Sequence, residues 1–340
     1  MRWPAAQVVG IDLSATSVGC TEELKSRYGL ANLTVQQLPV ERAGELECQF
    51  DQIICTGVLH HLADPATGIG ALRRVLKPDG VLHLMVYAPY GRTGIYLVQE
   101  FCRRAGILPT EQGLQQLLAT LQLLPTDHPI ARILREAPDF RSTAGLADAL
   151  LNPQDRAYSV PELMGLLADS GLQFARWARQ APYSARCGLL ASLPGALQLQ
   201  SLPPGEESAA AELFRGTMVR HSAVVYRDDH PWQSRRIGFS GPEFLKSLPL
   251  RLPDTVTVRE GLPRGAVAVL GSRSHAYADT TLPVGARELR VVESIDGTRT
   301  VADLIAAGAD PDRTAALLER LWWHDQIVFD ASRGSSGGDS

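Results

Sequence analysis

Short apolar runs recur through the first 90 residues, and each is followed by glycine, proline or a polar turn. Their length and their content of β-branched residues predict buried strands rather than helices. The runs that we assign to strands in this part of the chain lie at 7–13, 32–36, 52–55 and 81–86.

Helical signals separate these runs. Ser14 is placed to cap a helix with its body at 21–28, and Gly29 is placed to end it. A second helix is expected around 72–76, followed by a Pro-Asp-Gly turn at 78–80. Strand, helix and strand in this order form a βαβ unit, so the sequence predicts an α/β fold with a Rossmann-like, doubly wound sheet.

Beyond residue 90 the pattern becomes mostly helical and then mixed. The later helices are expected at 95–104, 113–124, 160–169, 206–214, 286–294, 300–307 and 312–323. The later strands are expected at 174–179, 223–227, 255–259, 266–270 and 326–329. We therefore divide the chain into a partial core (1–90), a helical insertion or lid (91–157), the completion of the sheet (158–228), a C-terminal module (229–331) and a disordered tail (332–340).

Composition excludes several classes of protein. The net charge of -4 and the scattered arginines give no nucleic-acid footprint, and no apolar run is long enough to span a membrane. The five cysteines have no metal-binding spacing, and no metal site is predicted. Several of these cysteines lie in apolar runs, which favours reduced thiols and a cytoplasmic location.

The first candidate site residues follow the first two strands. Asp12 ends the first strand, where a carboxylate can accept hydrogen bonds from two ribose hydroxyls, and Leu13 is assigned to the same site. The alternative is that Asp12 caps the following helix. Gln37 and Leu38 follow the next strand and offer an amide and an apolar face to a nucleoside ring, or form an ordinary surface turn.

Thr56, Gly57 and Val58 follow the strand at 52–55, and Gly57 permits close approach of a ligand to the backbone. The stretch FDQIICTGVLHHLADP at 50–65 resembles the corresponding motif of class I S-adenosylmethionine-dependent methyltransferases. The resemblance covers about residues 5–90 and, more loosely, the strands to residue 227. It implies S-adenosylmethionine as cofactor, with Asp12 on its ribose and the loop at 56–58 beside its methionine part.

Two adjacent histidines, His60 and His61, are the candidate catalytic residues. Adjacent side chains point to different sides, so a metal pair is disfavoured. One of them can act as a general base, since imidazole titrates near neutral pH. The alternative is a structural histidine at a strand-to-helix turn, and many methyl transfers need no base because positioning supplies most of the rate.

A third group of side chains comes after the strand at 81–86. Tyr87, Tyr90 and Arg92 follow its end, and Tyr158 recurs near the same edge of the expected sheet. These residues are the candidate walls of a substrate pocket, with the helical insertion as its lid. Each of them can equally be a packed aromatic or a capped helix end.

The Gly-rich loop of nucleotide-binding α/β folds lies about 20 residues before the acidic strand end. Only 11 residues precede Asp12. We therefore expect a sheet without its first strand, in a chain that is a fragment or a mis-started gene product rather than a degenerate homologue. Such a chain is expected to bind the cofactor weakly.

The C-terminal region reads helix, turn, helix, helix, strand over residues 286–329 and resembles a small winged-helix-like module. The helix at 300–307 has no Arg or Lys, so self-docking or protein contact is favoured over DNA binding. Three interpretations stay open: a methyltransferase with an unidentified acceptor, a non-catalytic binding homologue, and a regulatory protein acting through this module.

Overall fold

The computed structural model describes residues 5–136, 140, 142–152, 154–231, 237–274, 277–308 and 310–330. The chain divides into two compact units. The first unit is Met1–Arg176 with Gly216–Gln233, and the second unit is Trp177–Arg215 with Ser234–Ser340. The expected tail at 332–340 lies outside the described residues.

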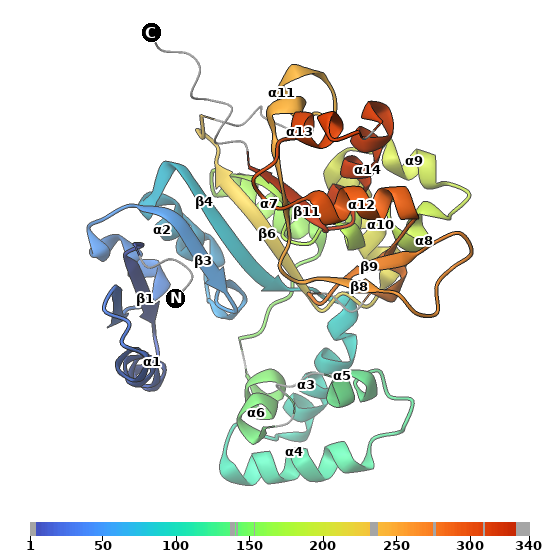
Figure 1. Ribbon diagram of the computed structural model, residues 1–340. Coiled ribbons are helices and arrows are strands. Elements are labelled where there is room, and N and C mark those ends of the chain that lie inside the picture. Colours follow the sequence, from blue (N-terminus) through green and yellow to red (C-terminus); the bar gives the residue numbers. More distant parts are fainter. Residues whose placement is uncertain are drawn as a thin grey trace. The chain divides into compact units, whose positions relative to one another are not determined.

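The strands of the first unit form two separate sheets (Figure 1). The first sheet is a parallel pair of β1 (Val8–Asp12) and β2 (Leu33–Gln37). The other has the order β3-β4-β6-β5, from β3 (Phe50–Thr56), β4 (Leu76–Tyr87), β6 (Arg220–Arg227) and β5 (Leu172–Trp177). β4 pairs parallel with β3 and antiparallel with β6. The expected strands are present, although β5 begins and ends two residues earlier than the sequence predicted.

The helix α1 (Ala15–Tyr28) contributes little to a core. Its ends are as predicted: the Ser14 hydroxyl accepts from the amide of Ser17 at 3.3 Å, and Gly29 ends the helix with φ 61°. None of its residues is buried, and Tyr28 is 68% exposed. The β1-α1-β2 segment is therefore held mainly by the pairing of β1 with β2 and by the hydrogen-bonded turns at the two ends of α1.

The helix α2 (Pro65–Val75) is packed far more tightly. The Asp64 carboxylate caps it by accepting from the amides of Ala66 and Thr67 at 3.1 and 3.4 Å. Six of its residues are buried: Pro65, Gly68, Ile69, Ala71, Leu72 and Val75. This helix fixes the chain between β3 and β4, and so positions the loops that follow both strands.

The expected turn at Pro78–Gly80 is instead a bulge inside β4. Phe50 pairs with Leu76 and Gln52 pairs with Val81, so the extra residues of β4 leave the ladder between these two pairs. A Cβ on Gly80 would lie 3.0 Å from the carbonyl oxygen of Phe50. Glycine therefore fits the bulge because the two strands approach closely there.

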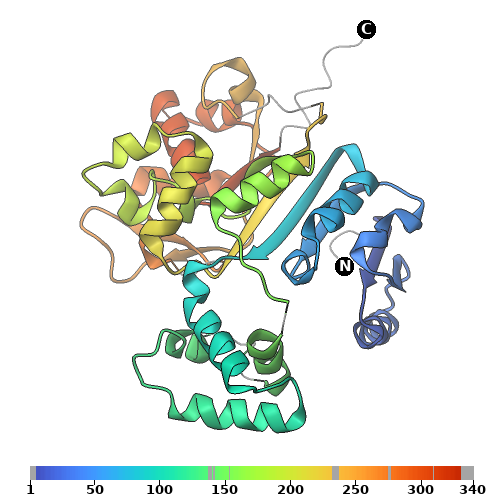
Figure 2. The same ribbon diagram turned by 180° about the vertical axis from the view of Figure 1, so that it is seen from behind.

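In its described residues, the insertion after β4 contains the helices α3 (Thr93–Ala105), α4 (Glu111–Leu123), α5 (Ala131–Glu136) and α6 (Thr143–Leu151). Figure 2 shows them gathered in one bundle. Their core is apolar and includes Ile95, Val98, Cys102, Leu117 and Ile130. The helix α7 (Val160–Asp169) follows, with the predicted bounds and Pro161 in its first turn.

The second unit is assembled from small elements. Its helices are α8 (Gly188–Ala191), α9 (Ala196–Gln200), α10 (Pro204–Arg215), α11 (Gly241–Lys246), α12 (Ala286–Ser294), α13 (Val301–Ala306) and α14 (Pro311–Trp323). Its strands β8 (Thr255–Val258), β9 (Ala268–Ser272) and β10 (Leu282–Val284) form one antiparallel sheet, and β7 (Leu248–Arg251) pairs with β11 (Ile327–Asp330). The sequence analysis missed several short elements of this unit, namely α8, α9, α11, β7 and β10.

Buried polar contacts join the two segments of the second unit. The Asp325 carboxylate, fully buried, accepts from the amides of Gln180 and Ala181 at 3.1 and 2.8 Å. Arg215 and Asp279 form an ion pair at 3.1 Å. The segment 177–215 therefore packs with the C-terminal region, whereas the sequence pattern had indicated that it completes the sheet.

Gly94 provides a test of how the insertion packs. A Cβ at this position would lie 2.3 Å from the backbone nitrogen of Ile130, which no rotamer change relieves. We expect Gly94→Ala to destabilise the protein by about 1–3 kcal/mol in chemical denaturation. The control is Gly165→Ala in α7, where nothing lies within 4 Å, and a gain of up to about 1 kcal/mol is expected. Equal effects of the two substitutions would show that α3 does not pack closely on Ile130.

The separation of the two sheets is testable by hydrogen exchange. Amides of β1 and β2 belong to a two-stranded ladder with little core behind it, whereas β4 lies between two partners. We expect β1 and β2 to exchange on the order of 100-fold faster than the central part of β4, since local opening there exposes little apolar surface. Comparable protection of the two regions by mass spectrometry would contradict this arrangement.

Candidate functional site

The carboxyl end of β1 carries Asp12, which is exposed to solvent. Its Oδ1 accepts a hydrogen bond from the amide of Ser14 at 2.7 Å. Asp12 therefore helps to turn the chain into α1, in keeping with the capping alternative, while the other carboxylate oxygen takes no part in this contact. Leu13 beside it is 71% exposed.

Gln37 and Leu38 lie at the neighbouring end of β2, because β1 and β2 are parallel and Asp12 pairs with Gln37. The Gln37 amide nitrogen donates to the carbonyl oxygen of Leu13 at 3.1 Å. Leu38 is only 7% exposed. These two side chains thus support the loop after β1, and Leu13 offers the larger open apolar surface.

Thr56, Gly57 and Val58 follow β3. Gly57 has φ 76°, in the left-handed region that favours glycine, and a Cβ added to it would meet nothing within 4 Å. The carbonyl oxygen of Val58 accepts from the amide of His61 at 2.9 Å, which closes a turn. The chain therefore bends sharply after Thr56 and brings both histidines back over the end of the sheet.

The two histidines occupy different environments. His60 is 1% exposed, and neither ring nitrogen has a hydrogen-bond partner among the described residues. Burial, with smaller contributions from His61 and Arg92, lowers the pKa of His60 to about 3, so its imidazole is neutral. The His61 ring is partly exposed, and its Nδ1 lies 2.8 Å from the carbonyl oxygen of Gln154.

Tyr87, the last residue of β4, is the centre of this cluster. The His60 ring centroid lies 3.7 Å from the Tyr87 ring centroid, and the Arg92 guanidinium carbon lies 3.5 Å from it. Two groups this close to one centroid must occupy opposite faces of the ring. Tyr87 is therefore held between a neutral imidazole and a cation, which fixes its orientation.

Arg92 is buried and paired. Its Nη2 lies 2.6 Å from Oδ2 of Asp155, and the two side chains are 6% and 2% exposed. Its Nε donates to the hydroxyl of Tyr96 at 3.0 Å, and the Gln99 amide donates to the same Asp155 oxygen at 2.9 Å. Burial raises the pKa of Tyr96 to about 12, so this hydroxyl stays protonated.

Among the sequence-predicted residues, the structure thus brings together His60, His61, Tyr87, Arg92 and Tyr158. Tyr158 is 1% exposed, and its amide donates to the carbonyl oxygen of Tyr87 at 2.9 Å. Tyr90 is 41% exposed and lies outside the packed cluster. Sequence reasoning missed Tyr96, Gln99 and Asp155, which come from the insertion and the segment after it. A buried arginine needs an acidic partner, but the sequence does not show that Arg92 is buried.

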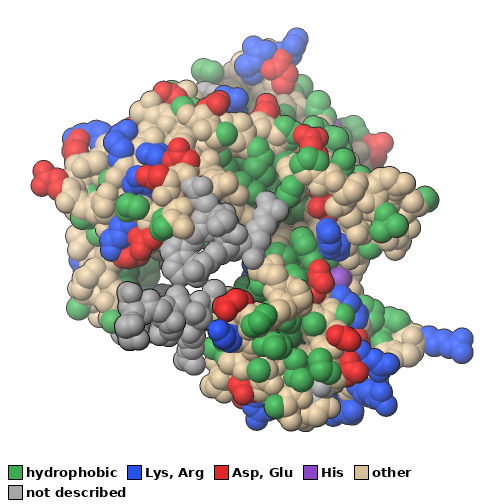
Figure 3. Space-filling model, turned by 90° about the horizontal axis from the view of Figure 1, so that it is seen from above, with side chains coloured by type: hydrophobic (Ala, Val, Ile, Leu, Met, Phe, Trp, Pro, Cys, Tyr) green, Lys and Arg blue, Asp and Glu red, His purple; other side chains and the backbone are tan. Residues whose placement is uncertain are grey.

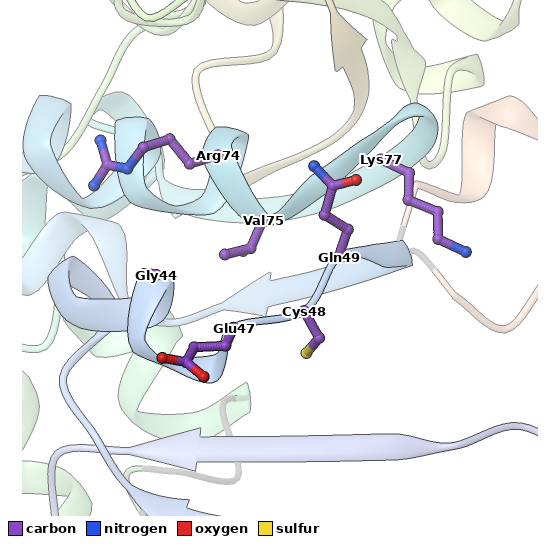
Figure 4. Close-up of a pocket in the computed structure, with 7 residues that line it drawn as sticks. All are labelled: Gly44, Glu47, Cys48, Gln49, Arg74, Val75 and Lys77. Carbon is purple, nitrogen blue, oxygen red and sulfur yellow. The ribbon is translucent and has the colours of Figure 1, made fainter.

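A hollow of about 630 Å³ lies elsewhere in the first unit. It is near the amino end of β3, and Figure 4 shows the side chains that line it. Its lining residues are Gly44, Glu47, Cys48, Gln49, Arg74, Val75 and Lys77. The candidate residues follow the carboxyl ends of the strands, so this open hollow is remote from them and carries no part of the site.

The described residues also bear on metal binding and on membrane insertion. Among them, no three His, Cys, Asp or Glu side chains are grouped to hold a metal ion. Within the same residues no helix has both the length and the apolar character needed to cross a bilayer. All five cysteines are free, and Cys55, Cys102 and Cys187 are buried.

Comparison with known proteins supports the expectation from the sequence. Residues 2–82 match a family model described as a methyltransferase domain. An uncharacterised protein of Synechococcus sp. is 34% identical over 182 residues, which are 50% of this chain and 42% of the relative. A ubiquinone biosynthesis O-methyltransferase of Acinetobacter baylyi is 33% identical over 76 residues, or 22% of this chain and 32% of the relative. The chain spans less than half the length of these curated relatives.

Solved structures extend the likeness in fold. PKMT2 from Rickettsia typhi superposes with a TM-score of 0.64 at 14% identity, over 97% of this chain and 67% of that one. The same protein in complex with AdoHcy gives a TM-score of 0.63 at 13% identity, over 96% of this chain and 67% of that one. Residues 2–82 therefore resemble a methyltransferase domain, and the chain shares the fold of PKMT2.

Proposed function

We propose that the chain binds S-adenosylmethionine at the carboxyl ends of β1, β2 and β3 and transfers its methyl group to an acceptor near His61. The observation that carries this proposal is the methyltransferase domain with Asp12 and Gly57 at strand ends and a polar cluster after the next strand. The complex of PKMT2 with AdoHcy, which shares the fold, supports the choice of cofactor.

The reaction is a displacement at carbon. A lone pair of the acceptor attacks the methyl carbon, the carbon–sulfur bond breaks, and its electron pair goes to sulfur to leave S-adenosylhomocysteine. The acceptor loses one proton in the process. Positioning of the acceptor in line with the bond supplies most of the rate, so the protein needs rigid contacts more than strong acids or bases.

Of the two histidines, His61 is the one suited to accept that proton. Its Nδ1 lies 2.8 Å from the carbonyl oxygen of Gln154, so we assign the hydrogen to Nδ1. The lone pair is then on Nε2, and the carbonyl fixes the ring. His60 is buried and its pKa is low, so its role is to pack on Tyr87.

The cofactor site, in this proposal, needs one more strand. The orders β2-β1 and β3-β4-β6-β5 become one continuous sheet if a parallel strand pairs with both β1 and β3. Val8 on β1 and Ile54 on β3 are 44% and 64% exposed, which is unusual for strand residues of a central sheet. In this proposal, the loop after such a strand supplies backbone amides for the cofactor's carboxylate.

The C-terminal helices α12, α13 and α14 with β11 form, in our proposal, a winged-helix-like docking module. They share an apolar core that includes Leu289, Val301, Leu318 and Ile327. The helix α13 carries Asp303 and no Arg or Lys, which favours protein contact over binding to phosphate backbones. Figure 3 shows acidic and basic side chains interspersed over one face of the molecule as a whole.

Cofactor binding can be measured by calorimetry. We expect a dissociation constant weaker than the micromolar range, and Asp12→Ala to weaken it further by roughly tenfold to several hundredfold, since hydrogen bonds to a charged acceptor contribute about 1.5–3 kcal/mol each. Asp12→Asn keeps an oxygen for the Ser14 amide and should still lose affinity. His61→Ala should leave affinity unchanged. No effect of Asp12→Ala would overturn the proposed site, whereas tight binding by the parent would overturn only the proposed need for a further strand.

The neutral state of His60 predicts a pH dependence of stability. Its pKa is about 3 in the folded protein and about 6.5 when unfolded, so between these values only the unfolded chain binds the proton. Stability therefore falls as pH falls below about 6.5 and is unaffected above it. Between pH 7 and pH 5 we expect the parent to lose about 2 kcal/mol more than His60→Phe in urea unfolding. Parallel pH profiles for the two proteins would show that His60 is protonated in the folded state.

A further inference from the structure

The segment 188–205 of the second unit contains no charged residue. It holds α8 and α9 and consists only of leucine, glycine, proline, alanine, serine and glutamine. Charged residues make up 21% of the whole chain, so a run of this length without one is unusual. Figure 1 shows α8 and α9 at the edge of the second unit.

Most of this uncharged segment lies at the surface. Only Leu190 and Ala196 are buried in it, so its exposed surface is continuous along the chain. Leu197 is 77% exposed and Leu189 is 58% exposed, and Leu202 is exposed as well. Continuous exposed apolar surface on a folded protein marks a site of contact with a partner or a membrane.

The charged groups beside the segment do not point to an ionic partner. Asp279 accepts from the amide of Leu189 at 3.0 Å and forms an ion pair with Arg215 at 3.1 Å. Arg186 lies 3.7 Å from Glu207. Because these charges are already paired, the partner that fits the segment is uncharged over the area of contact.

The backbone of the segment is largely satisfied from within. Amides donate to carbonyl oxygens of the same segment at Ser192, Leu193, Ala196, Leu199, Ser201 and Leu202. Pro194, Pro203 and Pro204 have no N–H group to satisfy. An apolar medium supplies no hydrogen bonds, so a segment that pairs its own backbone enters such a medium at lower cost.

The composition also distinguishes a lipid surface from a protein partner. The strongest contacts in protein interfaces come from Trp, Tyr and Arg, whereas Leu and Ser are under-represented there. The segment 188–205 has no aromatic side chain and no Arg, and α8 and α9 are too short to present a helical stripe to a groove. A bilayer requires apolar area without charge and no matching shape, which the segment offers.

We propose that the segment 188–205 is a membrane-contact surface that binds the second unit to a bilayer of zwitterionic lipid. Leu189, Leu197 and Leu202 enter the boundary between headgroups and acyl chains, and the contact ends at Glu206, whose exposed carboxylate stays in water. With helices of four and five residues the segment lies on the bilayer and does not span it. Because the segment has no basic residue, its affinity comes from apolar area, and binding is reversible and insensitive to salt.

Flotation with vesicles tests this contact. The whole chain is mixed with phosphatidylcholine vesicles, and the bound fraction is measured against lipid concentration. We expect the parent to bind, with less than about a twofold change when sodium chloride is raised roughly tenfold or when phosphatidylserine is added. Leu197→Gln should weaken binding roughly tenfold, which corresponds to about 1.4 kcal/mol, because most of one leucine side chain no longer enters the lipid.

Two further variants separate lipid contact from a general effect of exposed leucine. Gln198→Glu adds a charge to an exposed side chain of α9 without removing an apolar contact, and it should weaken vesicle binding at least as much. Leu123→Gln in α4 is the matched control, since this leucine is 85% exposed but lies in the insertion, and it should bind like the parent. All three side chains are exposed, so the substitutions leave the fold intact.

Several outcomes would overturn the proposal. They are failure of the parent to bind phosphatidylcholine vesicles, undiminished binding by both Leu197→Gln and Gln198→Glu, and binding that requires phosphatidylserine or is lost in salt. A dimer in analytical ultracentrifugation that Gln198→Glu dissociates, without vesicle binding, would instead assign the segment to an interface between two copies of the chain. Vesicle binding needs neither cofactor nor acceptor, so it is decided separately from methyl transfer.

Discussion

The pairing of β4 is the interaction on which the first unit depends. This strand runs for 12 residues, pairs with β3 on one edge and with β6 on the other, and ends at Tyr87. The loops after β3 and β4 meet only because the two strands are parallel and end together, with Thr56 opposite Met85. His60 and Arg92 can therefore pack on opposite faces of the Tyr87 ring although they are not close in sequence. The register of β3 and β4 therefore determines which side chains meet at the candidate site.

The sequence predicted this framework well where a local signal existed. The ends of α1 followed from Ser14 and Gly29, and the bounds of α7 and α12 followed from Pro161 and from amphipathic periodicity. The methyltransferase resemblance rested on the motif at 50–65 and is confirmed over residues 2–82. These features share one property: neighbours in sequence determine them, so no knowledge of the tertiary structure is needed.

What the sequence could not predict depends on distant partners. Pro-Asp-Gly is a strong turn signal, yet at 78–80 it forms a bulge because β3 continues alongside and pairs on both sides of it. Arg92 and Asp155 are 63 residues apart, and nothing near Asp155 marks it as the partner of a buried cation. The side-chain amide of Gln37, which we expect to contact a nucleoside, donates to the backbone carbonyl of Leu13, and nothing in the sequence indicated this contact. Each outcome was decided by packing across the fold.

The division of the chain into units has a consequence for its synthesis. The second unit consists of two segments, and residues 216–233 return to the first unit between them. When a ribosome has released residue 215, the sheet still lacks β6 and the second unit still lacks most of its core, so neither can close. Until the C-terminal region has been synthesised, the apolar side chains of α8 to α10 have no core to pack against. Leu197 and Leu213 of these helices stay exposed even in the folded protein. During synthesis, the segment 177–215 must therefore be kept from aggregating. Because each unit consists of two separate segments, truncation of the gene at one position yields neither unit intact.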